Sequence, residues 1–519
     1  MYERAGVDRE KRKCRSHKKG SITVFLALLL SLVVSLICAG IQSVRMAAAR
    51  TQILNSLDIG LYSLFAQYDR TLLEDYDLFV LDASNGSGKL DLASVCKNME
   101  GYIKPILKQN SQKLTLQQCG LAGFRLLTDE DGEVFYGQIT EYMKETLGSQ
   151  GVQLLLDKMQ NRKKETKKAE DAGTKAEQEN TLESYESEMD QAAKRSEEVQ
   201  KEQEAAAQNT SPDAALFGDG SQSEVPAVTQ EPAAEVAKVD NPIPVIRRIR
   251  RMGLLELLVP AEKGISDKKL SKKELLSGRE KNSGLEMEET VQTDSSLTSQ
   301  VLYQQYLMEK LGNYSAPKEG GLSYQIEYII CGRDSDEENL RSIARKLLLV
   351  REGVNAACLA ADAGKHAQVT ALATAIASGF LVPPAEPVIE AALTLCWAFG
   401  ESVLDVRELF AGGRVPLVKS GTDWQLSLEN LPHLLEVLDT DRQDRADGLS
   451  YEDYLQVFLL SMERDKKILR GMDMVECALR AASGWENFRL DTCIVAAGGS
   501  VTVKANKLKT FTATREYYY

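Results

Sequence analysis

A run of uncharged residues near the N-terminus places the strongest limit on what this chain can be. The run extends from Gly20 to Val44, and Lys18, Lys19 and Arg45 lie at its borders. As a helix it would be about 37 Å long, because each residue adds about 1.5 Å. The hydrocarbon core of a bilayer is about 30 Å thick. The sequence therefore predicts a transmembrane helix over residues 20–44, in contact with membrane lipid.

The charges beside this helix predict its orientation. Residues 1–19 contain eight Lys or Arg residues and three acidic residues, whereas the whole chain has a formal net charge of −13. By the positive-inside rule, the tail stays in the cytoplasm and the bulk of the chain lies outside the cell membrane. A cleaved signal peptide is the alternative, but its apolar region usually has only about 7–15 residues. The acidic bulk also predicts no nucleic-acid partner.

Apolar residues at helical spacing continue beyond the membrane. This periodicity predicts one helix from about Ser21 to Tyr68, with one apolar face outside the bilayer. Further helices are expected over 337–361 and 388–409. The uncharged centre of the latter, 391–400, is too short to span a membrane, so we expect a buried core helix there.

Strand signals are fewer. The stretch 113–127 is interpreted as a strand pair, and 324–331 as either a strand or the start of a buried helix. Alternating residues at 500–504 and 509–515 predict two antiparallel strands with a turn near Asn506. Together these patterns predict a mostly helical α+β fold.

Changes in composition divide the chain. Residues 161–208 are nearly all Lys, Glu, Gln and Ala, and residues 210–241 are rich in Pro, Ala, Gly and Ser, which is typical of a flexible spacer. We predict five segments: a basic cytoplasmic tail (1–19), a transmembrane helix (20–44), an exported membrane-proximal α+β segment (45–160), a charged helix and flexible linker (161–240), and an exported α-rich domain with C-terminal strands (241–519).

Motifs that would indicate an enzyme are missing from the sequence. It has no P-loop, GxGxxG, HExxH or GxSxG motif, and outside the tail its only histidines are His366 and His433, for which we expect polar surface positions. An acidic cluster at 439–447 fails the EF-hand pattern, because Asp444 and Ser450 stand where Gly and a bidentate acid are needed. We interpret it as an acidic turn, with a loose cation site as the alternative. We expect no enzymatic activity, no catalytic residue, no cofactor and no metal ion.

Two further features leave alternatives open. Four Arg side chains within 247–251, on a helix predicted over 245–258, suit a partner surface, lipid headgroups or a solvated face paired with the acidic spacer. The nine cysteines are scattered without a CxxC motif, so most are expected to be small buried hydrophobes. Their disulfide state and the oligomeric state of the chain stay open.

The border of the membrane helix carries a short motif. Lys18-Lys19-Gly20-Ser21 before an apolar helix resembles the start of type IV pilin-like precursors. In those proteins a membrane peptidase cuts after the Gly, and the helix then packs into a filament. The resemblance makes Gly20 and Ser21 a candidate processing site. The pilin pattern also has Glu five residues after the cut, where this chain has Phe25, so it departs from the pattern for both processing and filament packing.

Longer stretches resemble a family of uncharacterised single-pass membrane proteins of Gram-positive bacteria, encoded near tight-adherence (Flp-type) pilus genes. The matching stretches begin at Gly20 (GSITVFLALLLSL), Tyr76 (YDLFVLDAS), Asn241 (NPIPVIRRIRRMGLLELLVP), Ile326 (IEYIICGRDSDEENL), Trp397 (WAFGESVLDVRELFAGGRVPLVK), Asp423 (DWQL) and Leu449 (LSYEDYLQVFLL).

The resemblance implies a membrane-anchored, non-enzymatic cell-surface protein. Its expected role is a structural or assembly component associated with a tight-adherence pilus or a secretion system, and its expected partners are the proteins of that system. An envelope sensor, a ligand-binding protein or an enzyme of unknown substrate is the alternative.

Overall fold

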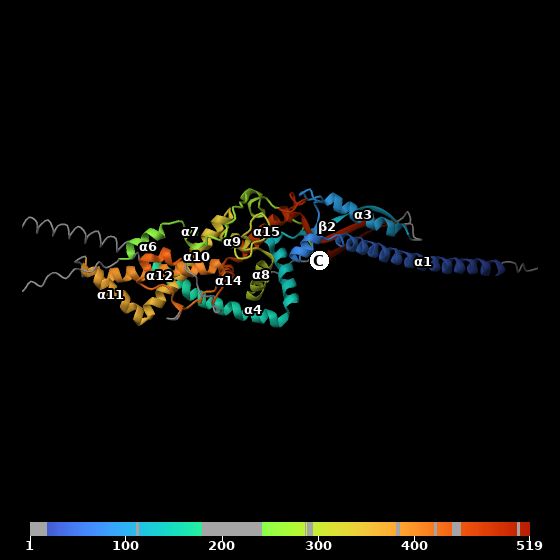
Figure 1. Ribbon diagram of the computed structural model, residues 1–519. Helices are drawn as coiled ribbons and strands as arrows, with labels where there is room; N and C mark the ends of the chain where they lie inside the picture. The colour runs from blue at the N-terminus through green and yellow to red at the C-terminus, as the bar shows by residue number, and fades with distance from the viewer. Residues whose placement is uncertain are drawn as a thin grey trace, which may run out of the picture.

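The computed structural model describes residues 18–109, 114–178, 241–285, 287, 294–379, 385–419, 423–438, 448–505 and 509–519. The molecule is elongated (Figure 1). A long helix projects from one end, a small sheet lies beside the second half of that helix, and a larger helical body follows.

Helix α1 (Lys18–Phe65) is continuous over 48 residues. The large apolar side chains between Ile22 and Val44 are exposed, and none of its most apolar window is buried. From Ala49 onward one face of the same helix is buried. The predicted continuation of the membrane helix is confirmed, and it ends close to the expected Tyr68.

The sheet combines strands from both ends of the chain. It contains β1 (Leu81–Asp82), β2 (Leu114–Leu126), β3 (Cys493–Ala505) and β4 (Lys509–Tyr518). The central strand is β3, which pairs antiparallel with each of the other three. The predicted C-terminal strand pair is confirmed and is longer than expected, while the turn near Asn506 lies outside the described residues.

The prediction of a strand pair over 113–127 is wrong. Strand β2 runs through this stretch without turning back, and its partner is β3. The register shifts between Leu116 and Gln118 and between Leu121 and Gly123. Such irregularities bend a strand without reversing it, so Gly120 and Gly123 do not mark a turn.

Two helices cover one face of this sheet. Helix α3 (Leu92–Lys108) packs against α1 and β2, and the outer half of α1 packs against β3 and β4. A Cβ at Gly499 would lie only 2.9 Å from a methyl carbon of Leu57 and 3.1 Å from one of Leu61. The missing side chain at Gly499 therefore allows α1 to approach the central strand closely.

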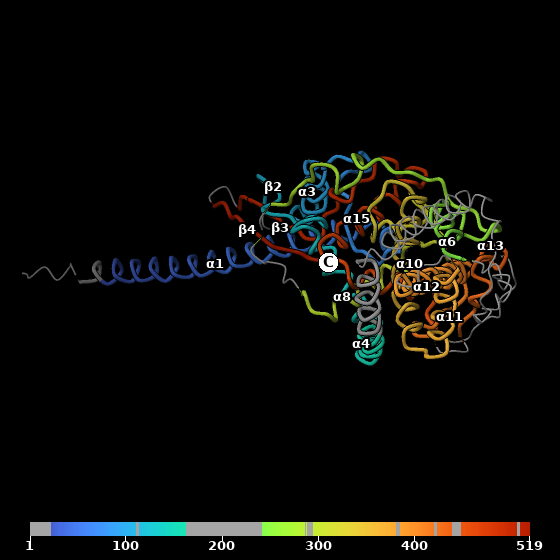
Figure 2. Tube along the Cα trace, turned by 90° about the vertical axis from the view of Figure 1, so that its left-hand side faces the viewer, coloured from blue at the N-terminus to red at the C-terminus, as the bar shows by residue number. Residues whose placement is uncertain are grey.

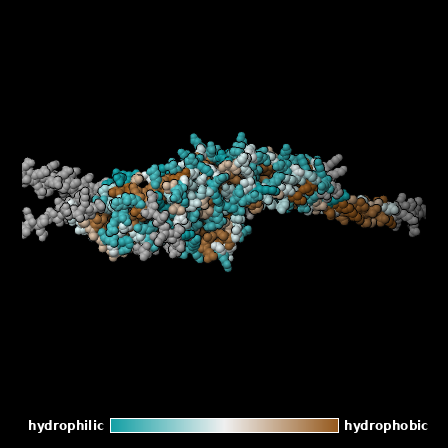
Figure 3. Space-filling model, in the orientation of Figure 1, coloured by the Kyte–Doolittle hydropathy of each residue, from teal (hydrophilic) through white to brown (hydrophobic). Residues whose placement is uncertain are grey.

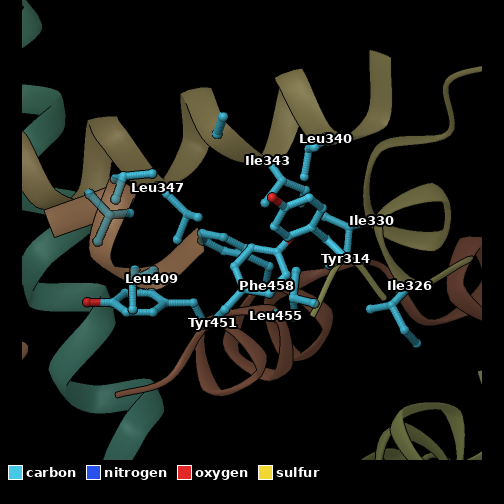
Figure 4. Close-up of a cluster of buried hydrophobic side chains, with 14 of the residues drawn as sticks. Tyr314, Ile326, Ile330, Leu340, Ile343, Leu347, Leu409, Tyr451, Leu455 and Phe458 are labelled. Atoms are coloured by element: carbon cyan, nitrogen blue, oxygen red, sulfur yellow. The ribbon is translucent and has the colours of Figure 1, made fainter. Parts of the chain in front are cut away.

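The helical body is larger and has its own core. Its helices are α4 (Glu133–Gln178), α6 (Ile243–Arg250), α7 (Leu254–Leu258), α8 (Leu297–Lys310), α9 (Gln325–Cys331), α10 (Asp336–Ala361), α11 (Ala363–Gly379), α12 (Glu386–Ala411), α13 (Leu434–Val437), α14 (Tyr451–Ser461) and α15 (Arg464–Arg480), and a short helix α2 (Arg70–Tyr76) follows α1. Helix α10 packs against both α4 and α12. Figure 4 shows Ile343 and Leu347 of α10 above Tyr451, Leu455 and Phe458 of α14.

The helical body contains three segments whose secondary structure is predicted from the sequence. Residues 324–331 form the buried helix α9, and not a strand. Helix α12 is long and apolar enough to span a membrane, but 67% of its most apolar window is buried, which confirms a core helix. The single helix expected over 245–258 is two, α6 and α7, because Gly253 adopts an extended conformation between them.

Candidate functional site

The exposed apolar half of α1 is the largest chemically distinctive surface of the molecule. Figure 3 shows it as a hydrophobic rod that projects from a mostly hydrophilic body. Side chains such as Leu26 and Leu36 are 64% and 71% exposed. This surface is suited to acyl chains and not to water, so α1 is a helix that could span a membrane.

The candidate processing residues lie at the start of this helix. Gly20 and Ser21 have helical backbone in α1, and their side chains are outside the description. Phe25 is 64% exposed on the same helix.

A cluster of buried charged side chains joins helices α10 and α12. The guanidinium of Arg351 donates from Nε and Nη2 to Oδ2 of Asp405, at 3.0 and 2.9 Å. Its Nη1 donates to the carbonyl oxygens of Pro416 and Leu417, at 2.9 and 3.0 Å. Asn355, one turn further along α10, donates to the same carboxylate oxygen of Asp405 at 3.0 Å. Arg351, Asn355 and Asp405 are all fully buried.

Lys419 extends the cluster to a second carboxylate. Its Nζ lies 2.6 Å from Oδ1 of Asp405 and also pairs with Glu401, one turn earlier on α12. The Glu401 carboxylate accepts hydrogen bonds from the backbone N–H groups of Gln425 and Leu426, at 3.0 and 2.7 Å. The two acids of α12 therefore fix the segments that follow this helix.

The positive and negative side chains of this cluster stabilise one another's charges inside the protein. Burial alone would raise the pKa of Asp405, but the charges of Arg351 and Lys419 outweigh burial and lower that pKa to about 2. A buried ion network of this kind is costly to disrupt, because each lost partner leaves a charge unpaired. With no exposed atom to offer a substrate, the cluster acts in cohesion of the fold.

A second charged cluster joins the helical body to the sheet. Arg279 donates to both carboxylate oxygens of Glu476 on α15, at 2.5 and 2.8 Å, and to Asp491 at 2.8 Å. Asp491 lies two residues before β3 and also accepts hydrogen bonds from Arg489 and Asn282. This cluster therefore fixes the start of the central strand against the helices.

One buried acid has an unusual environment. Glu327 on α9 accepts hydrogen bonds at Oε1 from the N–H of Tyr314 and the hydroxyl of Tyr451, both at 2.7 Å. Within the described part of the chain its Oε2 has no hydrogen-bond partner. Burial raises the pKa of Glu327 to about 7. The side chain therefore changes charge near neutral pH.

The histidines lie at the surface, as predicted. The side chains of His366 and His433 are 54% and 57% exposed, and each lies near one carboxylate, Glu390 and Glu436 respectively. Among the described residues no group of three or more His, Cys, Asp or Glu side chains is placed to hold a metal ion. The acidic cluster at 439–447 lies outside those residues.

The structure also shows the surroundings of the cysteines and of the Arg-rich helix α6. The eight described cysteines are free. Cys396, Cys477 and Cys493 are buried, whereas Cys38 is exposed and the other four are half-buried, so the expectation of burial holds for three of the eight. On α6, Arg250 forms an ion pair with Glu352 of α10 and stacks 4.4 Å from the ring centre of Phe399. This Arg side chain therefore binds α6 to the helical body.

Sequence reasoning did not identify the buried charges. Arg351 follows Leu347 by four residues and precedes Val354 by three, so it occupies a position on the apolar face of its helix. A charged residue at such a position is the one signal in the sequence that indicates a buried partner. The identity of that partner, Asp405, depends on how α10 and α12 pack.

Comparison with known proteins gives one match. A family model described as "Family of unknown function (DUF5702)" matches residues 232–505. No curated protein and no solved structure shows significant similarity to the chain. The matched region includes both charged clusters and ends on the last residue of β3, and it does not include α1.

Proposed function

Because this chain belongs to the DUF5702 family, whose function is unknown, we propose a function from its architecture. The chain is a membrane-anchored, non-enzymatic cell-surface protein that serves as a structural or assembly component of a tight-adherence pilus or secretion system. Residues 1–19 lie in the cytoplasm, and the sheet and helical body lie outside.

Helix α1 carries this proposal. Its first half exposes an apolar surface, and its second half is part of the core beneath the sheet, with Ile53, Leu57 and Leu61 buried. No break in the helix separates the two halves. A domain attached in this way keeps a fixed orientation toward the bilayer, which suits a protein that must present or align partners at the membrane.

The link to a pilus rests on the resemblances. The Lys-Lys-Gly-Ser border resembles pilin-like precursors, and the longer stretches resemble proteins of Gram-positive bacteria encoded beside tight-adherence pilus genes. A long helix, apolar in its first half and packed on a sheet in its second half, supports this proposal because pilin-like subunits also begin with such an apolar helix.

Protease treatment of intact cells tests the orientation. We expect an antibody against residues 300–519 to lose its signal when protease is added outside, while an epitope tag before Met1 stays protected. A tagged cytoplasmic protein controls for lysis. A C-terminal body that stays intact until the cells are opened contradicts the proposal.

N-terminal sequencing of the mature protein tests the pilin-like part separately. A start at Ser21 supports processing after Gly20, and Gly20→Val should then block the cut. A start at Met1 or Tyr2 indicates a plain anchor, and a start past Ala39 indicates a cleaved signal peptide and removes the anchor from the proposal.

A cavity favours the alternative of a ligand-binding envelope protein. It has a volume of about 660 Å³ beside α7 and is lined by Leu255, Leu435, Arg341, Glu256 and other side chains. This volume is within the range of small-molecule sites, about 300–1,000 Å³. A rise in the melting temperature of the full chain with a small anionic or amphipathic ligand, lost in Arg341→Ala, would support it over a purely structural role.

A further inference from the structure

The end of β3 and the start of β4 lie against α1 where the apolar run ends. Ala505, the last residue of β3, and Lys509, the first of β4, line a groove together with residues 38–46 of α1. The groove has a volume of about 910 Å³. In Figure 2 the hairpin of β3 and β4 extends alongside α1 toward its exposed half.

The length of α1 sets the depth of this groove in a membrane. A hydrocarbon core of about 30 Å takes about 20 helical residues. Counted from Ile22, the first large apolar residue after the basic border at Lys18 and Lys19, these residues end near Ile41. Gln42, Ser43 and Arg45 then lie at the level of the lipid headgroups, and Ala505 and Lys509, which line the same groove, lie at that level too.

Strand geometry determines which hairpin side chain faces α1. Along β3 the side chains of Val503 and Ala505 are buried, whereas Lys504 between them is exposed. Successive side chains of a strand point to opposite faces. Lys509 is paired directly with Ala505, and paired residues share a face. Lys509 is therefore on the α1 side of the hairpin and Lys504 on the opposite side.

The groove is basic in a chain of net charge −13. Arg45 and Lys509 are exposed, and within the described residues neither forms a recorded ion pair. Gln42 and Ser43 add uncharged polar groups to the same lining. Two cations beside hydrogen-bond donors suit a phosphate group, and the adjoining apolar surface of α1 suits acyl chains.

We propose that this groove binds the headgroup phosphate of an anionic phospholipid of the outer leaflet, with Arg45 and Lys509 as its cationic contacts. The lipid would hold the end of β3 and the start of β4 at the membrane surface and give the domain a second contact with the bilayer. This inference rests on the part of the proposed function that places residues 20–44 in the membrane, and it needs no pilus partner.

Native mass spectrometry of the full chain in a neutral detergent tests the proposal. We expect phosphatidylglycerol to be retained in preference to phosphatidylcholine. Because a basic residue near an anionic surface contributes about fivefold to binding, Arg45→Gln and Lys509→Gln should each weaken retention by about fivefold and together by about 25-fold. Lys504→Gln removes the same charge from the opposite face of the hairpin, at the end of the neighbouring strand β3, and it should leave retention unchanged.

Three results would overturn the assignment. Equal retention of phosphatidylcholine and phosphatidylglycerol excludes an anionic headgroup, and equal losses in Lys504→Gln and Lys509→Gln exclude this groove. Inorganic phosphate that binds as tightly as the lipid excludes a lipid site. A protein protected from external protease would refute the proposed orientation, whereas the lipid result would still report on the groove itself.

Discussion

Arg351 and Asp405 form an ion pair without exposed atoms, between two helices that pack through apolar side chains. Arg351→Met should remove the guanidinium partner of Asp405 and the donor to two backbone carbonyls, and it should lower the free energy of unfolding by about 3–5 kcal/mol. Thermal unfolding of the full chain in detergent measures this. Arg345→Met, on the exposed face of the same helix, should change stability by less than about 0.5 kcal/mol. Equal effects of the two substitutions would contradict a structural role for the cluster.

Glu327 predicts a pH dependence of stability. Because burial raises its folded-state pKa from 4.5 to about 7, folding favours the protonated form. Its contribution to stability is therefore complete below about pH 4.5 and is lost as the pH rises to 7. Glu327→Gln keeps an acceptor for Tyr314 and Tyr451 but does not ionise, so the variant should be more stable than the parent at pH 8, by up to about 3 kcal/mol, and similar at pH 4.5. Unfolding of parent and variant at pH 4.5 and pH 8 measures the difference in their stability. Glu337→Gln, at an exposed position, is the control. A stability difference between Glu327→Gln and the parent that is the same at both pH values would refute ionisation of Glu327.

At the scale of elements, local periodicity predicts helices well and strand partners poorly. Helix α10 carries its apolar residues at three- and four-residue spacing, so its limits could be predicted to within one residue. The partner of β2 lies more than 360 positions away, and nothing within 113–127 encodes it. The same limit applies to the charged clusters, because Arg351 indicates a buried partner while only the packing of α12 supplies Asp405.

The outer half of α1 is predicted to contribute to the stability of the domain. Leu57→Ala removes a fully buried side chain that lies against the sheet near Gly499, and it should lower the free energy of unfolding by about 2–5 kcal/mol. Ile59→Ala, on the exposed face two residues away, should cost little. Thermal melting of the full chain compares the stability of the two variants. If both variants melt like the parent, the outer half of α1 does not belong to the core of the domain.

At the scale of the whole molecule, one sheet combines segments from both sides of the predicted spacer. Strands β1 and β2 come from residues 81–126, and β3 and β4 come from residues 493–518. Helix α4 likewise packs against α10 and α8 of the later segment. Helix α1 is therefore joined to the C-terminal strands through packing as well as through the chain.

This arrangement predicts that a cut in the spacer will not separate the molecule. A protease site placed within residues 210–240 should be cleavable, yet the two fragments should co-elute on gel filtration at about 1 μM. They should stay together because β1 and β2 pair with β3 and because α4 packs against α8 and α10. The same insertion left uncut is the control for elution volume. Val503→Asp places a charge in the buried central strand and should allow the fragments to part after cleavage. Fragments that separate without that substitution would show that the two segments fold as independent domains.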